Sequence, residues 1–218
     1  MRLLRRRGLS ERARAYARSK APRAETPWRQ AHYAVVDLET TGLDPKHDEI
    51  VSFAAIPIDS GRVIVGRTST AIVRPSQMPP AETIRIHGLR PVDLAGAPTI
   101  ADVLDLVLEA LAGRVLVAHA AWVERGFLAA ALKPAGLRLH APVLDTGVLA
   151  ARVLRPEAAS EGRVIPLRDA ARLLGLPVHR PHVAEGDALT TAQLFLALAD
   201  HLDRHERQTV GSLARLSK

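Results

Sequence analysis

Residues 33–45 read YAVVDLETTGLDP, a short apolar run that carries two acids near its end and is followed by a turn. Tyr33–Leu38 predicts a buried strand. Side chains two positions apart on a strand share a face, so Asp37 and Glu39 lie side by side. Two like charges at the end of an apolar strand are costly unless a cation or hydrogen-bond donors compensate them. The stretch therefore predicts a buried strand ending in a cation site, with strand-end surface acids or helix caps as the alternative.

The segments after this strand predict an α/β fold with a mixed sheet. Two β-branched runs, Glu49–Ile58 and Arg62–Val73, are joined by Asp59-Ser60-Gly61, which favours a hairpin and hence an antiparallel three-strand meander. From Pro79 onward, helical apolar stripes alternate with short apolar runs, which is typical of α/β proteins. Helices are expected at 99–112, 122–132, 167–174 and 185–201 and from Asp145 or Thr146 to Leu154, with short strands at 114–119 and 143–145.

Composition limits the class of protein. The chain has 218 residues, 47% hydrophobic and 24% charged, which fits one globular domain with a short appendage. No run approaches the roughly 20 apolar residues that span a bilayer, so no membrane association is expected. The absence of cysteine excludes disulfides, thiolate zinc sites and cysteine nucleophiles. Aromatic residues make up only 3%, which argues against extensive base stacking on aromatic platforms.

The positive charge is concentrated at the amino terminus. The net charge is +7, but residues 1–30 hold ten Lys/Arg and two acids, leaving 20 basic and 21 acidic residues for 31–218. We interpret 1–30 as a basic arm, flexible or partly helical with Ser10 as a cap, before a main domain at 31–205 and a short tail at 206–218. The arm is either a solvated tail or a phosphate-attracting segment.

The arm also bears on location. It lacks the apolar run of a secretory signal, so a cytoplasmic protein of bacterial type is expected. Its Arg-rich, acid-poor composition leaves mitochondrial import as a minority alternative.

Two further segments place acids at the start of helices. Glu124 follows a predicted strand that ends at His119, and Asp187 begins a long helix, with His182 on the loop before it. Each acid alone is an ordinary helix-terminus residue. Strand ends and helix starts of open α/β sheets, however, converge on one crevice. Carboxylates gathered there need cations, and oxygen-only ligands suit Mg²⁺ or Mn²⁺. Two such ions roughly 4 Å apart would clamp an in-line phosphoryl displacement.

The motifs resemble those of a known family. They are VVDLETTGLDP at 35–45, HGL at 87–89, HAAWVE at 119–124 with Phe127-Leu128, Asp145-Thr146, and HVAEGDA at 182–188. They are similar to the motifs of the DEDDh 3′–5′ exonucleases of the RNase H-like superfamily, which includes the proofreading subunit of bacterial DNA polymerase III. The resemblance covers about residues 31–200 and implies an RNase H-like mixed sheet.

The resemblance implies a role for each motif residue. Asp37 would bridge two metal ions, Glu39 and Asp187 would complete the nucleophile-side ion, and Glu124 would hold the second. His182 would be the general base that deprotonates water. The expected substrate contacts are backbone groups around Thr40 and Thr41 for the terminal 3′-hydroxyl, Leu43 as a wedge against the terminal base, and His87 at the terminal nucleotides.

We therefore expect a phosphodiester hydrolase that acts on the 3′ ends of single-stranded DNA or short RNA with two Mg²⁺ or Mn²⁺ ions. A DNA polymerase or repair complex is a further expected partner, and the oligomeric state is left open. Two motif positions depart from the family: Glu124 stands where most members have Asp, and Ala120 where most have Asn. The longer Glu124 supports an alternative, a weakly active or inactive nucleic-acid-binding or nucleotide-binding module.

Overall fold

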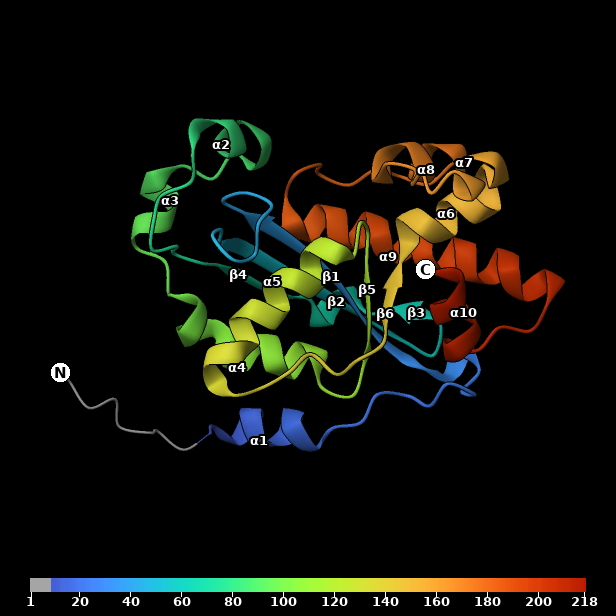
Figure 1. Cartoon of the computed structure of the whole chain (residues 1–218), viewed down its shortest axis with the longest axis horizontal. Coiled ribbons are helices and arrows are strands. Elements are labelled where there is room, and N and C mark those ends of the chain that lie inside the picture. The colour runs from blue at the N-terminus through green and yellow to red at the C-terminus, as the bar shows by residue number, and fades with distance from the viewer. Residues whose placement is uncertain (1–8) are drawn as a thin grey trace.

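The computed structural model describes residues 9–218. One six-stranded mixed sheet forms its centre, with strand order β3-β2-β1-β5-β6 and β4 also paired to β2 (Figure 1). β1 runs antiparallel to β2, whereas β5 is parallel to β1 and β6 is parallel to β5. The expected α/β class with a mixed sheet is confirmed. The strands are β1 His32–Thr40, β2 Ile50–Asp59, β3 Arg62–Val63, β4 Ser69–Ile72, β5 Val115–Ala118 and β6 Val143–Asp145.

The expected third strand is interrupted. The predicted run Arg62–Val73 forms β3 and β4, with a 3₁₀ turn at Val65–Arg67 between them. Both pieces pair with β2, so the meander topology holds although the single strand was wrong. The turn lies where Gly66, which weakens a strand, follows the exposed Val65.

Helices cover both faces of the sheet. Alternate residues of β1 enter two separate cores: Tyr33 and Val35 pack with α9, and Ala34 and Val36 pack with α4 and α5. Asp37 continues the series on the α9 side. The helices are α1 Glu11–Arg18, α2 Ala81–His87, α3 Pro91–Ala95, α4 Ile100–Leu111, α5 Trp122–Leu132, α6 Thr146–Leu154, α7 Pro156–Ser160, α8 Leu167–Leu173, α9 Ala184–His205 and α10 Val210–Leu216.

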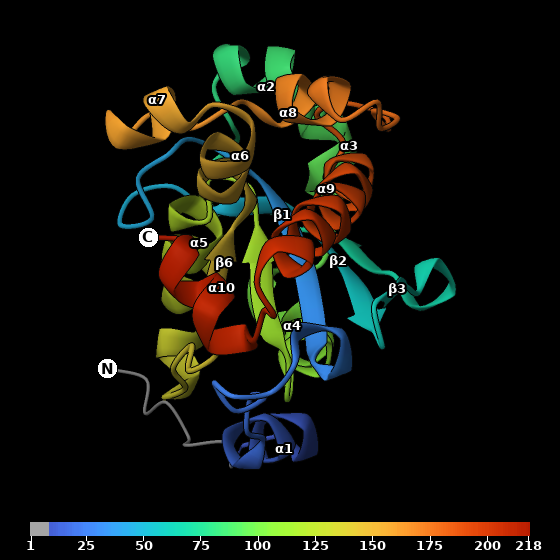
Figure 2. The same ribbon diagram turned by 90° about the vertical axis from the view of Figure 1, so that its right-hand side faces the viewer.

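The basic segment packs onto the domain over its described part. Ser10 caps α1 by accepting from the Ala13 N–H, as its sequence predicts. Tyr16 is buried, and its hydroxyl donates to the Arg138 carbonyl at 3.0 Å. Figures 1 and 2 both place α1 at the opposite end of the molecule from α8. The segment is thus partly helical as expected but packed; its Arg5–Arg7 cluster lies outside the described residues.

The carboxyl-terminal segment is also built into the domain. α10 buries Val210 and Leu213 in the core on the α9 side, and Thr209 forms an isolated β-bridge with Pro27. The segment before β1 and the short tail predicted at 206–218 therefore contact each other, and the tail packs against the core through α10. Among the described residues, no helix has the length and apolarity needed to cross a membrane.

Candidate active site

Three carboxylates from two distant parts of the chain meet at the carboxyl end of β1. Asp37, Glu39 and Asp187 each offer an oxygen, and these oxygens lie within 4.8 Å of one another. β1 supplies the first two on one face, and the first turn of α9 supplies the third. All three side chains are half-buried. This is the only group of three or more potential metal ligands in residues 9–218.

Glu124 lies beside this group on the first turn of α5. It is 4% exposed, and its Oε2 atom is buried without a hydrogen-bond partner. Its charge raises the pKa of Asp37, which places the two carboxyls in electrostatic contact. A buried carboxylate oxygen without a partner is costly, and a bound cation would relieve that cost. The structure thus brings all four predicted acids to one site, with Glu124 outside the tight three-residue group.

The electrostatics show four acids that resist ionisation together. Burial, then Glu124, Glu39 and Asp187, raise the pKa of Asp37 well above its usual value. Burial and then Asp187 raise the pKa of Glu39 to about 7. Burial raises the pKa of Glu124 to about 8, helped by Asp145 and Glu39. Burial also raises the pKa of Asp187. Strongly raised carboxyl pKa values in one crevice are typical of a functional site.

The loop before α9 is shaped to hold His182 beside Asp187. The His182 backbone N–H donates to Asp187 Oδ2 at 2.7 Å, while the imidazole is exposed. His182 and Arg180 both have positive φ, a strained conformation for residues with side chains. Gly186 permits this fold, because a Cβ there would lie 2.6 Å from the Arg180 carbonyl oxygen. The predicted general base is therefore exposed at its side chain and hydrogen-bonded to Asp187 through its backbone.

A second acid, Asp145, organises the start of α5. Its carboxylate accepts from the N–H groups of Ala121 at 2.8 Å and Gly147 at 2.8 Å, so it links the start of α5 to α6, which it caps. Ala120 has φ +60°, in the left-handed region that costs roughly 1–2 kcal/mol for a residue with a Cβ. Asn adopts this region more readily than Ala does.

The strain at Ala120 predicts a stabilising substitution. Ala120→Gly should raise the free energy of unfolding by roughly 0.5–1 kcal/mol, since Gly adopts positive φ without a steric penalty. Denaturant unfolding measures it. Ala129→Gly, in the middle of α5, is the control and should lower stability by about 1 kcal/mol. Equal destabilisation by both variants would contradict the strain at Ala120.

The threonines of the loop after β1 stabilise it through hydrogen bonds within the loop. The Thr41 hydroxyl donates to Asp48 Oδ1 and accepts from the Glu49 N–H, both at 3.0 Å, and the Thr41 N–H donates to the Glu49 carbonyl. The Thr40 hydroxyl donates to the Gly42 carbonyl. Gly42 lies against Asp48, where a Cβ would be 2.6 Å from the carboxyl carbon. Both threonines thus stabilise the loop, and their contact with a substrate stays a prediction.

The predicted wedge and the predicted histidine differ in exposure. Leu43 is 64% exposed on the same loop, so it is free to contact a ligand. His87 is 7% exposed near the end of α2; its Nδ1 accepts from the Leu89 N–H, and its Nε2 is buried without a partner. Burial lowers the pKa of His87, which favours the neutral ring. The contact of either residue with nucleotides stays a prediction.

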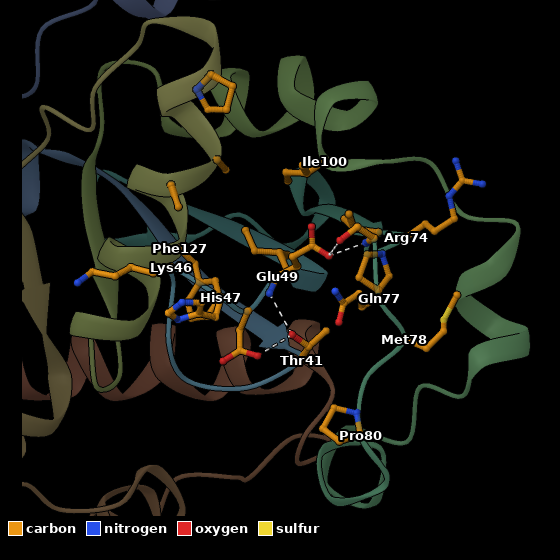
Figure 3. Close-up of a pocket in the computed structure, with 18 residues that line it drawn as sticks. Thr41, Lys46, His47, Glu49, Arg74, Gln77, Met78, Pro80, Ile100 and Phe127 are labelled. Atoms are coloured by element: carbon orange, nitrogen blue, oxygen red, sulfur yellow. Dashed lines mark hydrogen bonds between the residues drawn. The ribbon is translucent and has the colours of Figure 1, made fainter.

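The same loop borders a cavity that does not include the acids. The cavity measures about 460 Å³, and Figure 3 shows Thr41, Lys46 and His47 of the loop around it together with Phe127 of α5. Phe127 and the other core residues of this cavity belong to the α4 and α5 side of the sheet, opposite α9. None of the four acids lines it. The candidate active site is therefore the cluster of acids at the end of β1, apart from this cavity.

Sequence reasoning missed two charged groups. Arg168 of α8 acts electrostatically on Asp187 and offsets a small part of the rise in its pKa that burial causes. Asp145 is one of the groups that raise the pKa of Glu124. The Asp145-Thr146 pair predicted the start of a helix, but it did not predict that Asp145 would lie near Glu124. Nothing in the sequence near Arg168 indicated that α8 would bring it toward a carboxylate of α9.

Comparison with known proteins decides the family. A family model described as "Exonuclease" matches residues 34–195, which is most of the chain. The chain belongs to this exonuclease family. The match confirms the resemblance to the DEDDh exonucleases that the motifs indicated.

Curated relatives carry this exonuclease region within longer proteins. A DNA polymerase III subunit epsilon-like protein of Rhodobacter capsulatus is 36% identical over 87% of this chain and 27% of its own length. A PolC-type DNA polymerase III of Clostridium perfringens is 31% identical over 82% of this chain and 12% of its own. A putative bifunctional exonuclease/endonuclease of Mycobacterium tuberculosis is 32% identical over 92% of this chain and 32% of its own length. The chain thus spans a third or less of these relatives.

Solved structures share the fold. Exonuclease X in complex with 5′ overhanging duplex DNA aligns with a TM-score of 0.66 at 21% identity, over 85% of this chain and 99% of that chain. Exonuclease I of E. coli in complex with a dT13 oligonucleotide aligns with a TM-score of 0.68 at 19% identity, over 81% and 42%. Both confirm the fold of the RNase H-like exonucleases.

Proposed function

We propose that the exonuclease family member described here is a metal-dependent 3′–5′ exonuclease that acts on single-stranded DNA or short RNA ends. The observation that carries the proposal is the meeting of Asp37, Glu39 and Asp187 within 4.8 Å at the end of β1, beside the buried Glu124. Such a group of acids serves no packing purpose and destabilises the protein without a cation. The four acids stand in the order and spacing of the family motifs.

The donor set fits divalent metal ions. All four ligands are carboxylates, which suits Mg²⁺ or Mn²⁺. The Glu124 Oε2 atom, buried without a partner, is an unused ligand position. Asp37, Glu39 and Asp187 would hold one ion, and Glu124 with Asp37 would hold the other. When bound, the ions would supply Lewis-acid stabilisation of the attacking and leaving oxygens of the phosphodiester.

The protein's own residues supply proton transfer and positioning. We infer that His182 accepts a proton from the attacking water; its exposed side chain and the bond from its backbone N–H to Asp187 support this role. Leu43 would lie against the terminal base, and the loop at Thr40 and Thr41 would seat the terminal 3′-hydroxyl. His87 would face the terminal nucleotides.

The polymerase relatives indicate the setting of this activity. Several are DNA polymerase III proteins in which the matched region is one part of the chain. We infer a nucleic-acid 3′ end as the substrate and a cytoplasmic polymerase or repair complex as the context. The basic segment would add phosphate attraction that weakens with salt, although its described part lies away from α8 (Figure 2).

An oligonucleotide assay tests the proposal. A 5′-labelled single strand incubated with Mg²⁺ or Mn²⁺ should yield a ladder that shortens from the 3′ end, and chelation should stop it. His182→Asn should slow cleavage by about 10²–10⁴-fold, the usual contribution of a general base. A 3′-labelled strand should release its label at once. Absence of the ladder with both metals, or release of mononucleotides from the 5′ end, would overturn the proposal.

One observation favours a second candidate, a weakly active or inactive nucleic-acid-binding module. Glu124 is absent from the tight ligand group, which contains Asp37, Glu39 and Asp187 only. Calorimetry with Mn²⁺ separates the candidates, because the module should bind one ion and the exonuclease two. Under the module reading, Glu124→Asp should increase cleavage. A decrease in cleavage with that variant would support Glu124 as the native ligand.

A further inference from the structure

Each segment that supplies an acid also carries a large exposed apolar side chain a few residues away. Leu43 follows Glu39 on the β1–β2 loop and is 64% exposed. Trp122 precedes Glu124 on α5 and is 59% exposed, and Val183 precedes Asp187 and is 40% exposed. A cluster of acids flanked in sequence by exposed apolar side chains matches a ligand that has a charged backbone and flat apolar groups beside it.

Trp122 lies on the exposed face of α5, at the start of the helix. Successive residues of an α-helix are turned by about 100°, so Trp122 and Glu124 project in nearly opposite directions. Glu124 is accordingly buried, whereas Trp122 is exposed. Trp122 shares a helix face with Gly126, and a Cβ at Gly126 would lie 3.0 Å from Pro45. Because Pro45 is on the loop that carries Leu43, the loop and this face of α5 form one surface; Figures 1 and 2 show both side by side.

Packing does not account for the exposed indole. The chain has two tryptophans, and Trp28 is the buried one, with its ring edge-on to Phe195 at 6.3 Å. An indole that is 59% exposed two residues from Glu124 offers its face to a flat group of a ligand bound at the acids. Unpaired bases stack on such side chains, whereas bases within a duplex already stack on their neighbours.

We propose that Trp122 stacks on an unpaired base of the substrate strand upstream of the terminal nucleotide, and so favours oligonucleotides over mononucleotide esters. This inference rests on the proposed function. Because the indole and the Glu124 carboxylate lie on opposite faces of α5, the indole would contact a base beyond the terminal nucleotide and not the scissile phosphate. Every base offers a π-face, so the contact should show little sequence preference.

A pair of substrates tests the role of Trp122. Trp122→Ala should raise KM for a single-stranded octathymidylate by about 10-fold with kcat little changed, the size expected for one base–aromatic stack. Trp122→Phe should restore most of the affinity. The p-nitrophenyl ester of thymidine 5′-monophosphate has no upstream base, so its cleavage should be unchanged. Val65→Ala is the matched control, because Val65 is 53% exposed near β3, away from the acids.

Fluorescence gives a readout that a structural role would not move. In an Asp37→Asn background, octathymidylate should quench the exposed indole, and the quenching should vanish with Trp122→Phe, which leaves only the buried Trp28. If the wild type cleaves neither substrate, the proposed function fails. If it cleaves both and Trp122→Ala leaves KM for the octamer unchanged or alters the ester as much, only the stacking inference fails.

Discussion

Replacing Asp37 by Asn should lower cleavage by at least about 10³-fold and, at the same time, make the metal-free protein more stable at pH 8. The pKa of Asp37 is raised by burial and by the charges of all three other acids, Glu124, Glu39 and Asp187. The amide keeps the shape of the side chain but removes both a metal ligand and a buried charge. If Asp37 served only to stabilise the fold, the substitution would instead lower the stability of the metal-free protein.

Two measurements on the same variant separate these roles. Initial rates on a labelled oligonucleotide give the loss of activity, and denaturant unfolding in a chelator gives the change in stability. Asp169→Asn is the control, because Asp169 is an exposed carboxylate of α8 and should alter neither quantity. A variant of Asp37 that loses activity and stability together would indicate a structural acid and contradict the metal site.

The sheet and the acids could be predicted because their physical signals are local. The alternation along β1 assigns Val35 to one core and Val36 to the other, and the same alternation puts Asp37 and Glu39 on one face. The positions of Glu124 and Asp187 could be predicted because each stands at the start of a helix, and helix starts of α/β sheets converge at one sheet edge. The distances between the acids depend on tertiary packing, so the sequence did not predict that Glu124 lies outside the group of Asp37, Glu39 and Asp187.

The terminal segments were harder to predict because charge masked their apolar residues. The ten basic residues of 1–30 favoured a separate arm, yet Ala13 and Tyr16, three positions apart on one face of α1, are buried. Trp28 was a further sign of packing, since a large aromatic residue in a polar segment is seldom free. The left-handed conformation of Ala120 carries no such signal, because Ala is not a residue that marks positive φ.

Glu124 should make the stability of the metal-free protein depend on pH. Burial raises its pKa to about 8, above its usual value in an unfolded chain, so the folded metal-free protein pays for ionising it. Stability should therefore be unaffected below about pH 4.5 and fall as the pH rises toward 8, because the unfolded chain releases this proton first. Glu124→Gln should remove that loss, with a gain on the order of 4 kcal/mol at pH 8 and less than about 1 kcal/mol at pH 5.

Metal ions should reverse this dependence in the wild type. Divalent cations bind the ionised carboxylates, so Mn²⁺ should stabilise the wild type more at pH 8 than at pH 5.5, and Glu124→Gln should weaken that response. Thermal unfolding at both pH values, with Mn²⁺ and with chelator, measures the four states. Glu185→Gln is the matched control, because Glu185 is an exposed glutamate in the first turn of α9. An equal difference between wild type and Glu124→Gln at both pH values would show that Glu124 is not a buried, ionisable metal ligand.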